Sequence, residues 1–270
     1  MTTDKKYSKL QNILYSMGEV VVAYSGGVDS TFLLKTAFDV LGDKAIGVLA
    51  ISPTFPSREY ESAKEIAAKI GAKIEIIETR ELENETYRSN PVNRCYFCKD
   101  ELFSKILVIA NQYGHKNIVD GSNFDDINDH RPGLQALKEK GVRSPLQEAC
   151  FTKNEIRKLS KQLRLPTWNK DSLACLSSRF PYGEEIVLNK LKRVDEMENF
   201  LTDLGFRNIR ARDQKNTLKI EVARKDIKRF ASDELRETIV KKAKLLGYNY
   251  ITVDLEGYRQ GSLNEVIKKF

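Results

Sequence analysis

The stretch Ser25-Gly26-Gly27-Val28-Asp29-Ser30 decides the fold of this chain. It follows the apolar run at 20–24 and precedes a helical pattern that begins at Thr31. We therefore predict a buried strand that runs into a glycine turn, which then opens a helix. In that arrangement, free backbone N–H groups and the positive end of the helix dipole face one point and favour an anion there. The alternative is an ordinary strand–helix turn.

The glycine turn is not the GxxxxGK[ST] phosphate loop, because no lysine follows its glycines. It resembles the pyrophosphatase loop (PP-loop) of the ATP-pyrophosphatases. The resemblance implies that ATP is cut between its α- and β-phosphates and that a substrate oxygen is adenylated. We expect Mg²⁺ to screen the triphosphate, since it prefers hard oxygen ligands. The residues assigned to the nucleotide are Ser25, Gly26, Gly27, Asp29, Ser30 and, at the end of the next strand, Ser52.

Composition and charge narrow the class of protein. Of 270 residues, 41% are hydrophobic and 31% charged, and no apolar run approaches the roughly 20 residues of a membrane span. The first residues lack the apolar segment of a signal peptide, so we predict a cytoplasmic protein without a membrane partner. Most of the net charge of +7 lies in 186–270, with 19 Lys and Arg against 13 Asp and Glu. Because no nucleic-acid motif accompanies this charge, we expect a small nucleotide as the partner.

Hydrophobic patterning predicts two domains. The first part alternates strand-like and helix-like segments, which indicates an α/β fold with a parallel sheet covered on both faces. Ligands of such sheets bind at the carboxyl ends of the strands. After Gly183 the pattern changes to a compact α+β arrangement. Predicted strands are 19–24, 45–51, 73–78, 117–120, 208–212, 218–223 and 248–255; predicted helices are 29–41, 57–70, 99–113, 134–140, 152–163, 191–204 and 226–246.

The cysteines form an incomplete metal pattern. Cys95 and Cys98 make a CxxC, which is typical of a redox pair, half of a zinc site or part of an iron–sulfur site. No second CxxC is present, and neither histidine stands at zinc-finger spacing. With Cys175, three thiolates suit a [4Fe–4S] cluster whose open iron holds a ligand such as sulfide. The alternative is three unrelated structural cysteines. Cys150 is expected to be a buried core residue at a helix start.

Taken together, the chain resembles the LarE family, the ATP-dependent sulfur insertases of nickel-pincer cofactor biosynthesis, which serves lactate racemase maturation. Family members have a PP-loop adenine-nucleotide α-hydrolase domain, expected at 1–185, and a small α+β domain for substrate binding and oligomerisation, expected at 186–270. The resemblance implies a homo-oligomer, in the family often a hexamer. The segments that carry the resemblance are 25–30, 120–133, 144–149, 168–170, 177–183 and 255–261.

The resemblance also implies a reaction. Family enzymes adenylate a carboxylate of pyridinium-3,5-biscarboxylic acid mononucleotide and convert it to a thiocarboxylate. In one branch, a cysteine at the position of Cys175 gives up its own sulfur. In the other, three cysteines resemble ligands of a [4Fe–4S] cluster that carries the sulfide. This chain has Cys95, Cys98 and Cys175, so it fits the second branch, with an unidentified source that reloads the sulfide. Sacrifice of Cys175 is the alternative.

Further site residues follow from the same resemblance. We assign the carboxylates and phosphate of the substrate to four arginines, because arginine pairs with both groups in a bidentate manner. Two of them stand two residues apart on a predicted strand and therefore face the same side. Acidic positions of the family site are expected to order the arginines or bind metal. The assigned arginines are Arg179, Arg210, Arg212 and Arg259, and the catalytic residues are Cys175, Asp29, Asp126 and Glu198.

Three other readings remain open for the sequence alone. A tRNA thiolase also combines a PP-loop with a three-cysteine cluster, and the basic C-terminal third fits it. A PP-loop amidotransferase or synthetase would need an ammonia source, and no glutaminase domain fits into 270 residues. A nucleotide-binding stress-type protein would leave the three cysteines unexplained.

Overall fold

The computed structural model describes residues 2–128, 133–172 and 174–266. It divides into two compact units that interleave along the chain. The first comprises Met1–Ser52, Ser57–Glu81 and Asn93–Leu173; the second comprises Pro53–Pro56, Leu82–Val92 and Ala174–Phe270. In the described residues, no helix combines the length and apolar character needed to cross a membrane.

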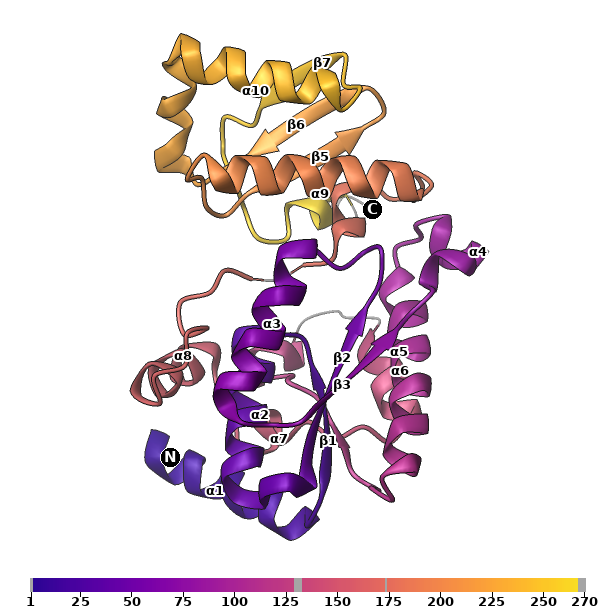
Figure 1. Cartoon of the computed structure of the whole chain (residues 1–270), viewed down its shortest axis with the longest axis vertical. Helices are drawn as coiled ribbons and strands as arrows, with labels where there is room; N and C mark the ends of the chain where they lie inside the picture. The colour runs from indigo at the N-terminus through magenta and orange to yellow at the C-terminus, as the bar shows by residue number, and fades with distance from the viewer. Residues whose placement is uncertain (1, 129–132, 173, 267–270) are drawn as a thin grey trace. The chain divides into compact units, whose positions relative to one another are not determined.

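The first unit is a parallel sheet between helices. Its strands run in the order β3-β2-β1-β4, and all neighbouring pairs are parallel. Helices α2 and α3 lie on one side of the sheet and α5 and α6 on the other (Figure 1). The predicted α/β fold is confirmed. The bounds are α1 Thr3–Met17, β1 Val20–Tyr24, α2 Val28–Leu41, β2 Ala45–Ile51, α3 Ser57–Ile70, β3 Ile74–Glu78, α5 Arg94–Gln112, β4 Ile118–Val119, α6 Gly133–Glu139, α7 Pro145–Glu148 and α8 Lys153–Gln162.

Strand β1 occupies the interior of this sheet. It pairs with β2 on one side and β4 on the other, and Val20, Val21 and Val22 are fully buried. A strand covered on both faces needs a continuous apolar sequence, which explains the run that ends at Tyr24. The strand order also reverses direction at β1, so the glycine loop that follows lies where parallel sheets bind ligands.

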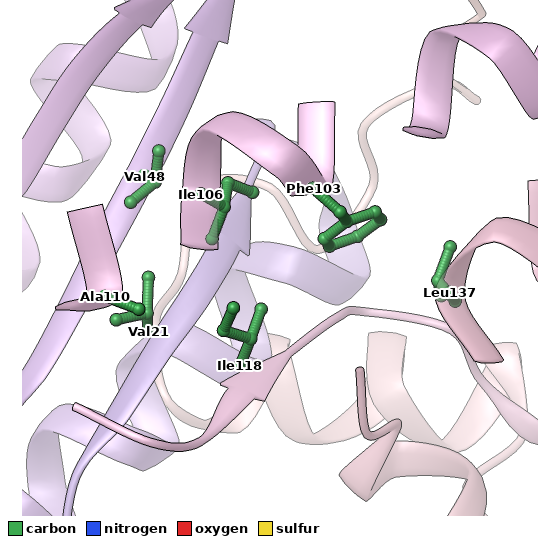
Figure 2. Packing of buried hydrophobic residues seen from close by; sticks show 7 residues of the cluster. All are labelled: Val21, Val48, Phe103, Ile106, Ala110, Ile118 and Leu137. Carbon is green, nitrogen blue, oxygen red and sulfur yellow. The ribbon is translucent and has the colours of Figure 1, made fainter. Parts of the chain in front are cut away.

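A buried cluster holds α5 and α6 against the sheet (Figure 2). The ring of Phe103 and the side chain of Ile106 are both fully buried in it. Each side chain of this size contributes about 1.5–3 kcal/mol when removed from water, so the cluster fixes α5 firmly. The strands therefore lie beneath a helix whose first turns carry the CxxC. The cluster consists of Val21, Val48, Phe103, Ile106, Ala110, Ile118 and Leu137.

The second unit contains a three-stranded sheet and two long helices. Strands β5 and β6 form an antiparallel pair, and β7 joins β6 in parallel. The predicted amphipathic helix at 191–204 is confirmed as α9, which buries the predicted apolar positions. The bounds are α4 Glu85–Arg88, α9 Leu188–Asp203, β5 Arg210–Gln214, β6 Thr217–Glu221, α10 Asp233–Leu245 and β7 Tyr250–Val253.

Some helix boundaries differ from the sequence prediction. The helix expected from residue 99 begins at Arg94, so it includes the CxxC. The single helix expected at 226–246 is wrong. It is a 3-10 helix, Arg224–Ala231, followed by α10, because Ser232 adopts an extended conformation and its side chain accepts the Leu235 N–H. Helix α1 was not predicted.

The expectation for Cys150 also needs correction. It was predicted to be buried at a helix start, but it is only half-buried and has a φ of 60°. Its N–H bonds the Gln147 carbonyl oxygen at 2.8 Å, so it closes the turn after α7. Helix α8 begins two residues later with a capping box between Thr152 and Glu155, which confirms that part of the prediction.

Candidate active site

The glycine loop between β1 and α2 is a tight, packed turn. Gly26 has a φ of 67°, a region that residues with a Cβ rarely adopt. A Cβ placed there would lie 2.6 Å from the Cβ of Ala63, so the loop backbone rests directly on α3. Gly27 caps α2 without a side-chain hydrogen bond. The first N–H groups of α2 have no partner within the helix and can bind an anion.

The two serines of the loop contact one another. Ser30 Oγ accepts the Ser25 N–H at 3.2 Å, and the two hydroxyl oxygens are 3.1 Å apart. The turn after β4 approaches the same place, since a Cβ on Gly121 would lie 3.0 Å from the Ser30 nitrogen. Ser52 follows β2 directly at the same edge of the sheet. The carboxyl ends of three strands therefore surround the start of α2.

Asp29 lies in the first turn of α2 within a charged group. Its carboxylate forms an ion pair with Lys153 at the start of α8, and Asn123 Nδ2 lies 3.5 Å from its Oδ1. Burial raises the pKa of Asp29; the Lys153 charge opposes this shift, and the negative charge of Asp126 adds to it. Asp126 Oδ2 in turn accepts the Asn123 N–H at 3.0 Å. Two carboxylates and an ammonium thus adjoin the anion-binding loop.

Lys153 and Lys170 were not predicted as site residues. Lys170 Nζ donates to the Gly26 carbonyl oxygen at 3.1 Å, and it lies 2.5 Å from Glu59 Oε2. The capping box at Thr152 indicates where α8 begins but not what Lys153 faces. Both lysines reach the loop across more than 120 residues of sequence, and no local pattern signals such a contact.

A second charged group lies in the second unit, around Arg179. Its guanidinium forms a bidentate pair with Glu198 of α9, with N–O distances of 2.8 and 2.7 Å, and is 3% exposed. Burial acts to lower the pKa of Arg179, but the Glu198 charge raises it above its ordinary value. Arg179 Nη1 also donates to the carbonyl oxygens of Ala174 and Cys175, at 3.0 and 3.1 Å. Arg179 therefore fixes the backbone at Cys175.

Arg210 and Arg212 lie on the same face of β5, opposite the apolar core face. Arg212 pairs with Glu221 of β6 at 3.0 and 2.9 Å and donates to the Ser178 carbonyl oxygen at 2.6 Å. The Arg210 guanidinium lies over the ring of Tyr258, 4.7 Å from its centroid. Burial, followed by the positive charge of Arg179, lowers the pKa of Arg210. The structure brings these three arginines together, and a bound anion would stabilise them.

Arg259 is in a different environment. It is about half-buried and forms ion pairs with Glu256 and Glu265, both of which are exposed. Its neighbour Tyr258 connects it to the Arg210 region, because the Tyr258 hydroxyl lies 3.3 Å from Arg210 Nη2. Arg259 can change partners at a lower cost than the buried arginines, since exposed ion pairs contribute little to stability.

The cysteines of the predicted cluster fall in different units. Cys95 is exposed and Cys98 half-buried, one turn apart at the start of α5 in the first unit, whereas half-buried Cys175 belongs to the second. All four cysteines lie in the described residues, and none forms a disulfide. Within residues 2–128, 133–172 and 174–266, no three Cys, His, Asp or Glu side chains form a group that could hold a metal ion. Arg131 and Pro132, which belong to a resemblance segment, lie outside the described residues.

Comparison with known proteins identifies the family. The chain is 35% identical over 269 residues to the pyridinium-3,5-bisthiocarboxylic acid mononucleotide synthase of Lactiplantibacillus plantarum, covering 99% of this chain and 97% of that protein. It is 45% identical over 265 residues to an uncharacterized protein of Synechocystis sp., covering 97% and 99%. No family model matches the chain.

A shorter similarity reaches one of the subunits that form the glutamine-hydrolyzing GMP synthase in Saccharolobus solfataricus. It is 27% identical over 163 residues, which are 55% of this chain and 44% of that protein. This partial match agrees with the parallel sheet and the glycine loop of the first unit. The full-length similarity to the synthase, together with that loop, places the chain in the LarE family of pyridinium-3,5-bisthiocarboxylic acid mononucleotide synthases, as an ATP-using sulfurtransferase of the PP-loop superfamily.

Proposed function

We propose that this enzyme converts carboxylates of pyridinium-3,5-biscarboxylic acid mononucleotide to thiocarboxylates at the expense of ATP. The observation that carries the proposal is the similarity to the Lactiplantibacillus synthase over 99% of the chain. A carboxylate is a poor electrophile, so it must be activated before sulfur can attack. Attack of the substrate carboxylate on the α-phosphate of ATP gives an acyl-adenylate and releases pyrophosphate.

The glycine loop is the proposed site for the pyrophosphate. The N–H groups at the start of α2 and the helix dipole stabilise the charge that develops on the leaving phosphates. Asp29 and Asp126 provide hard oxygen ligands beside the loop, which suits Mg²⁺ held by one or two carboxylates and the phosphates of a nucleotide. Lys153, which neutralises Asp29 here, is then available to bind a phosphate oxygen. Ser25, Gly26, Gly27, Ser30 and Ser52 complete the proposed nucleotide site.

The arginine group of the second unit is the proposed substrate site. Arg210 is 8% exposed, and burial and neighbouring positive charge lower its pKa, so a carboxylate or phosphate would relieve its environment. Arg212 and Arg179 are held in place by Glu221 and Glu198, which supports a role for Glu198 in ordering the site. Arg259, with exposed partners, is proposed to close on the substrate.

Sulfur delivery is proposed to involve Cys95, Cys98 and Cys175. Three thiolates are the donor set that iron–sulfur clusters use, and the CxxC pair stands one turn apart on the rigid helix α5. A [4Fe–4S] cluster held by these residues would supply a transferable sulfide. As the sulfur bonds to the activated carbonyl carbon, the bond to AMP breaks and AMP leaves. In the alternative mechanism, Cys175 supplies its own sulfur.

One experiment tests both the reaction and the sulfur source. Anaerobically purified enzyme is incubated with ATP, Mg²⁺ and the pyridinium dicarboxylate nucleotide, and products are identified by mass spectrometry. Iron and acid-labile sulfide are measured on the same sample and on Cys98→Ala, Cys175→Ala and the control Cys150→Ala. About four irons per chain, lost in the first two variants and retained in the control, are expected for the cluster.

The contrary outcomes separate the proposals. Iron-free protein that is active and loses 34 Da at Cys175, roughly the mass of hydrogen sulfide, assigns the sulfur to that cysteine. ATP turnover without any thiocarboxylate overturns the proposed reaction. The homo-oligomeric state, a hexamer by family resemblance, is a further proposal, and light scattering of the purified enzyme measures it directly. The cytoplasmic location stays a prediction.

A further inference from the structure

Lys170 connects three parts of the first unit at the glycine loop. Its ammonium donates to the Gly26 carbonyl oxygen at 3.1 Å and to Ser62 Oγ at 3.4 Å, and it pairs with Glu59 at 2.5 Å. The side chain is 18% exposed. A lysine that is mostly withdrawn from water and points at a loop carbonyl group restricts how that peptide group can turn.

The backbone at Lys170 is itself anchored. Arg157 of α8 donates through Nη1 to the Trp168 carbonyl oxygen at 2.9 Å and through Nη2 to the Lys170 carbonyl oxygen at 2.8 Å. One guanidinium therefore fixes the segment from which the Lys170 side chain extends. The contact with Gly26 is thus held from a rigid support, and it is not a chance contact of a surface side chain.

The orientation of the Gly26–Gly27 peptide has a direct consequence for anion binding. In a trans peptide the carbonyl oxygen and the following N–H point in opposite directions. With the Gly26 carbonyl directed at Lys170, the Gly27 N–H points away from Lys170. Gly27 is the N-cap of α2, where the N–H groups gather for an anion. A rotated peptide would present a carbonyl oxygen to the phosphates in place of a donor, and two glycines resist such rotation only weakly.

We propose that Lys170 is a positioning residue that holds the Gly26–Gly27 peptide so that the Gly27 N–H faces the bound pyrophosphate. The inference deepens the proposed function, on which its choice of ligand rests. Glu59 neutralises much of the Lys170 charge, so direct attraction of the phosphates by Lys170 is small. The effect of Lys170 therefore comes from orientation of the loop.

The test measures binding of inorganic pyrophosphate with Mg²⁺ to the full-length protein by calorimetry. Lys170→Met should weaken binding about tenfold, the size of one hydrogen bond to a charged group. Lys170→Arg keeps a charged donor and should stay within about threefold of wild type. Lys170→Gln keeps a neutral donor and should fall between them. Lys161→Met is the matched control, because Lys161 lies over the Trp168 ring on the same segment, 4.6 Å from its centroid.

A double variant separates orientation from charge. Lys170→Met alone leaves Glu59 without its partner, and a free carboxylate could repel pyrophosphate. If orientation is the cause, Lys170→Met/Glu59→Gln remains as weak as the single variant. Recovery of wild-type affinity in the double variant, or wild-type affinity in Lys170→Met itself, overturns the proposal. Pyrophosphate binding requires neither the pyridinium nucleotide nor a sulfur donor, so failure of the sulfur chemistry would leave this comparison intact.

Discussion

The glycine loop of the first unit and the arginine group of the second both suit anions, but they are built differently. The loop uses backbone N–H groups from one continuous stretch, Ser25–Ser30, and a helix dipole that every helix has. The arginine group collects side chains from Arg179 and from β5, each of which is buried. Backbone groups are positioned by forming the helix, whereas buried guanidinium groups must be balanced by carboxylates.

This difference predicts where mutations act. Changes in the loop should affect nucleotide handling more than folding, because few side chains depend on it. Changes in the arginine group should affect folding first, since Arg179 and Arg212 each share their site with a glutamate that is largely withdrawn from water. The variants below test this contrast.

The largest effect is expected for Arg179→Met. It leaves Glu198, which is 13% exposed, without its bidentate partner and should lower the free energy of unfolding by about 3–5 kcal/mol. Urea denaturation measures the loss. The double variant Arg179→Met/Glu198→Gln removes both charges and should recover much of it. If the single and double variants are equally unstable, the ion pair is not the reason for the loss.

Gly26→Ala should have the next largest effect. The positive φ costs about 1–2 kcal/mol for alanine, and the new Cβ would meet Ala63 at 2.6 Å, which adds about 1–3 kcal/mol or displaces the loop. Pyrophosphate release from ATP should therefore fall sharply. Gly42→Ala is the control, because its φ is 57° but no atom lies within 4 Å of its Cβ position. Equal ATP turnover in the two variants would refute a role for the close contact with α3.

A smaller effect is expected in the pH dependence of stability. Burial raises the pKa of Asp29, so the folded protein favours the protonated carboxyl more than the unfolded chain does. Stability from this group is present at low pH and is lost as pH rises from the ordinary value of 3.8 through the raised pKa. The unfolding free energy of wild type relative to Asp29→Asn should therefore decrease over that range in urea titrations. An increase would show that the Lys153 ion pair dominates over burial.

The smallest stability change is expected for Arg259→Met. Its partners Glu256 and Glu265 are 69% and 53% exposed, so the change in unfolding free energy should stay within about 0.5 kcal/mol. The proposed substrate contact predicts a higher KM for the pyridinium nucleotide with unchanged affinity for pyrophosphate. A stable variant with an unchanged KM would remove Arg259 from the substrate site.

The sequence predicted what local patterns determine. The bounds of α3 agree with the prediction at both ends, because the apolar spacing and the flanking residues coincide there. The Thr152–Glu155 capping box was visible from residue types alone. The glycine loop was found because its function resides in six consecutive residues.

The missing parts depend on contacts between distant segments. Lys153 and Lys170 reach the loop from far along the chain, and a lysine in a helix or turn carries no signal of its partner. The break at Ser232 replaced a helix because a serine cap competes with continuation of the helix. Which glutamate accepts which arginine was likewise outside the reach of periodicity.

The interleaving of the two units has a consequence for how the protein can form. Three contacts of the second unit join its early and late segments: the Leu176 N–H to the Thr54 carbonyl oxygen, the Tyr87 hydroxyl to Ser177, and the Gly183 N–H to the Asn90 carbonyl oxygen. The domain boundary expected at residue 185 stays a prediction, and a fragment that begins there would lack Pro53–Pro56 and Leu82–Val92. On the ribosome, these short segments emerge long before their partners. The second unit can therefore mature only when nearly the whole chain has been made, after every segment of the first unit has already been synthesised.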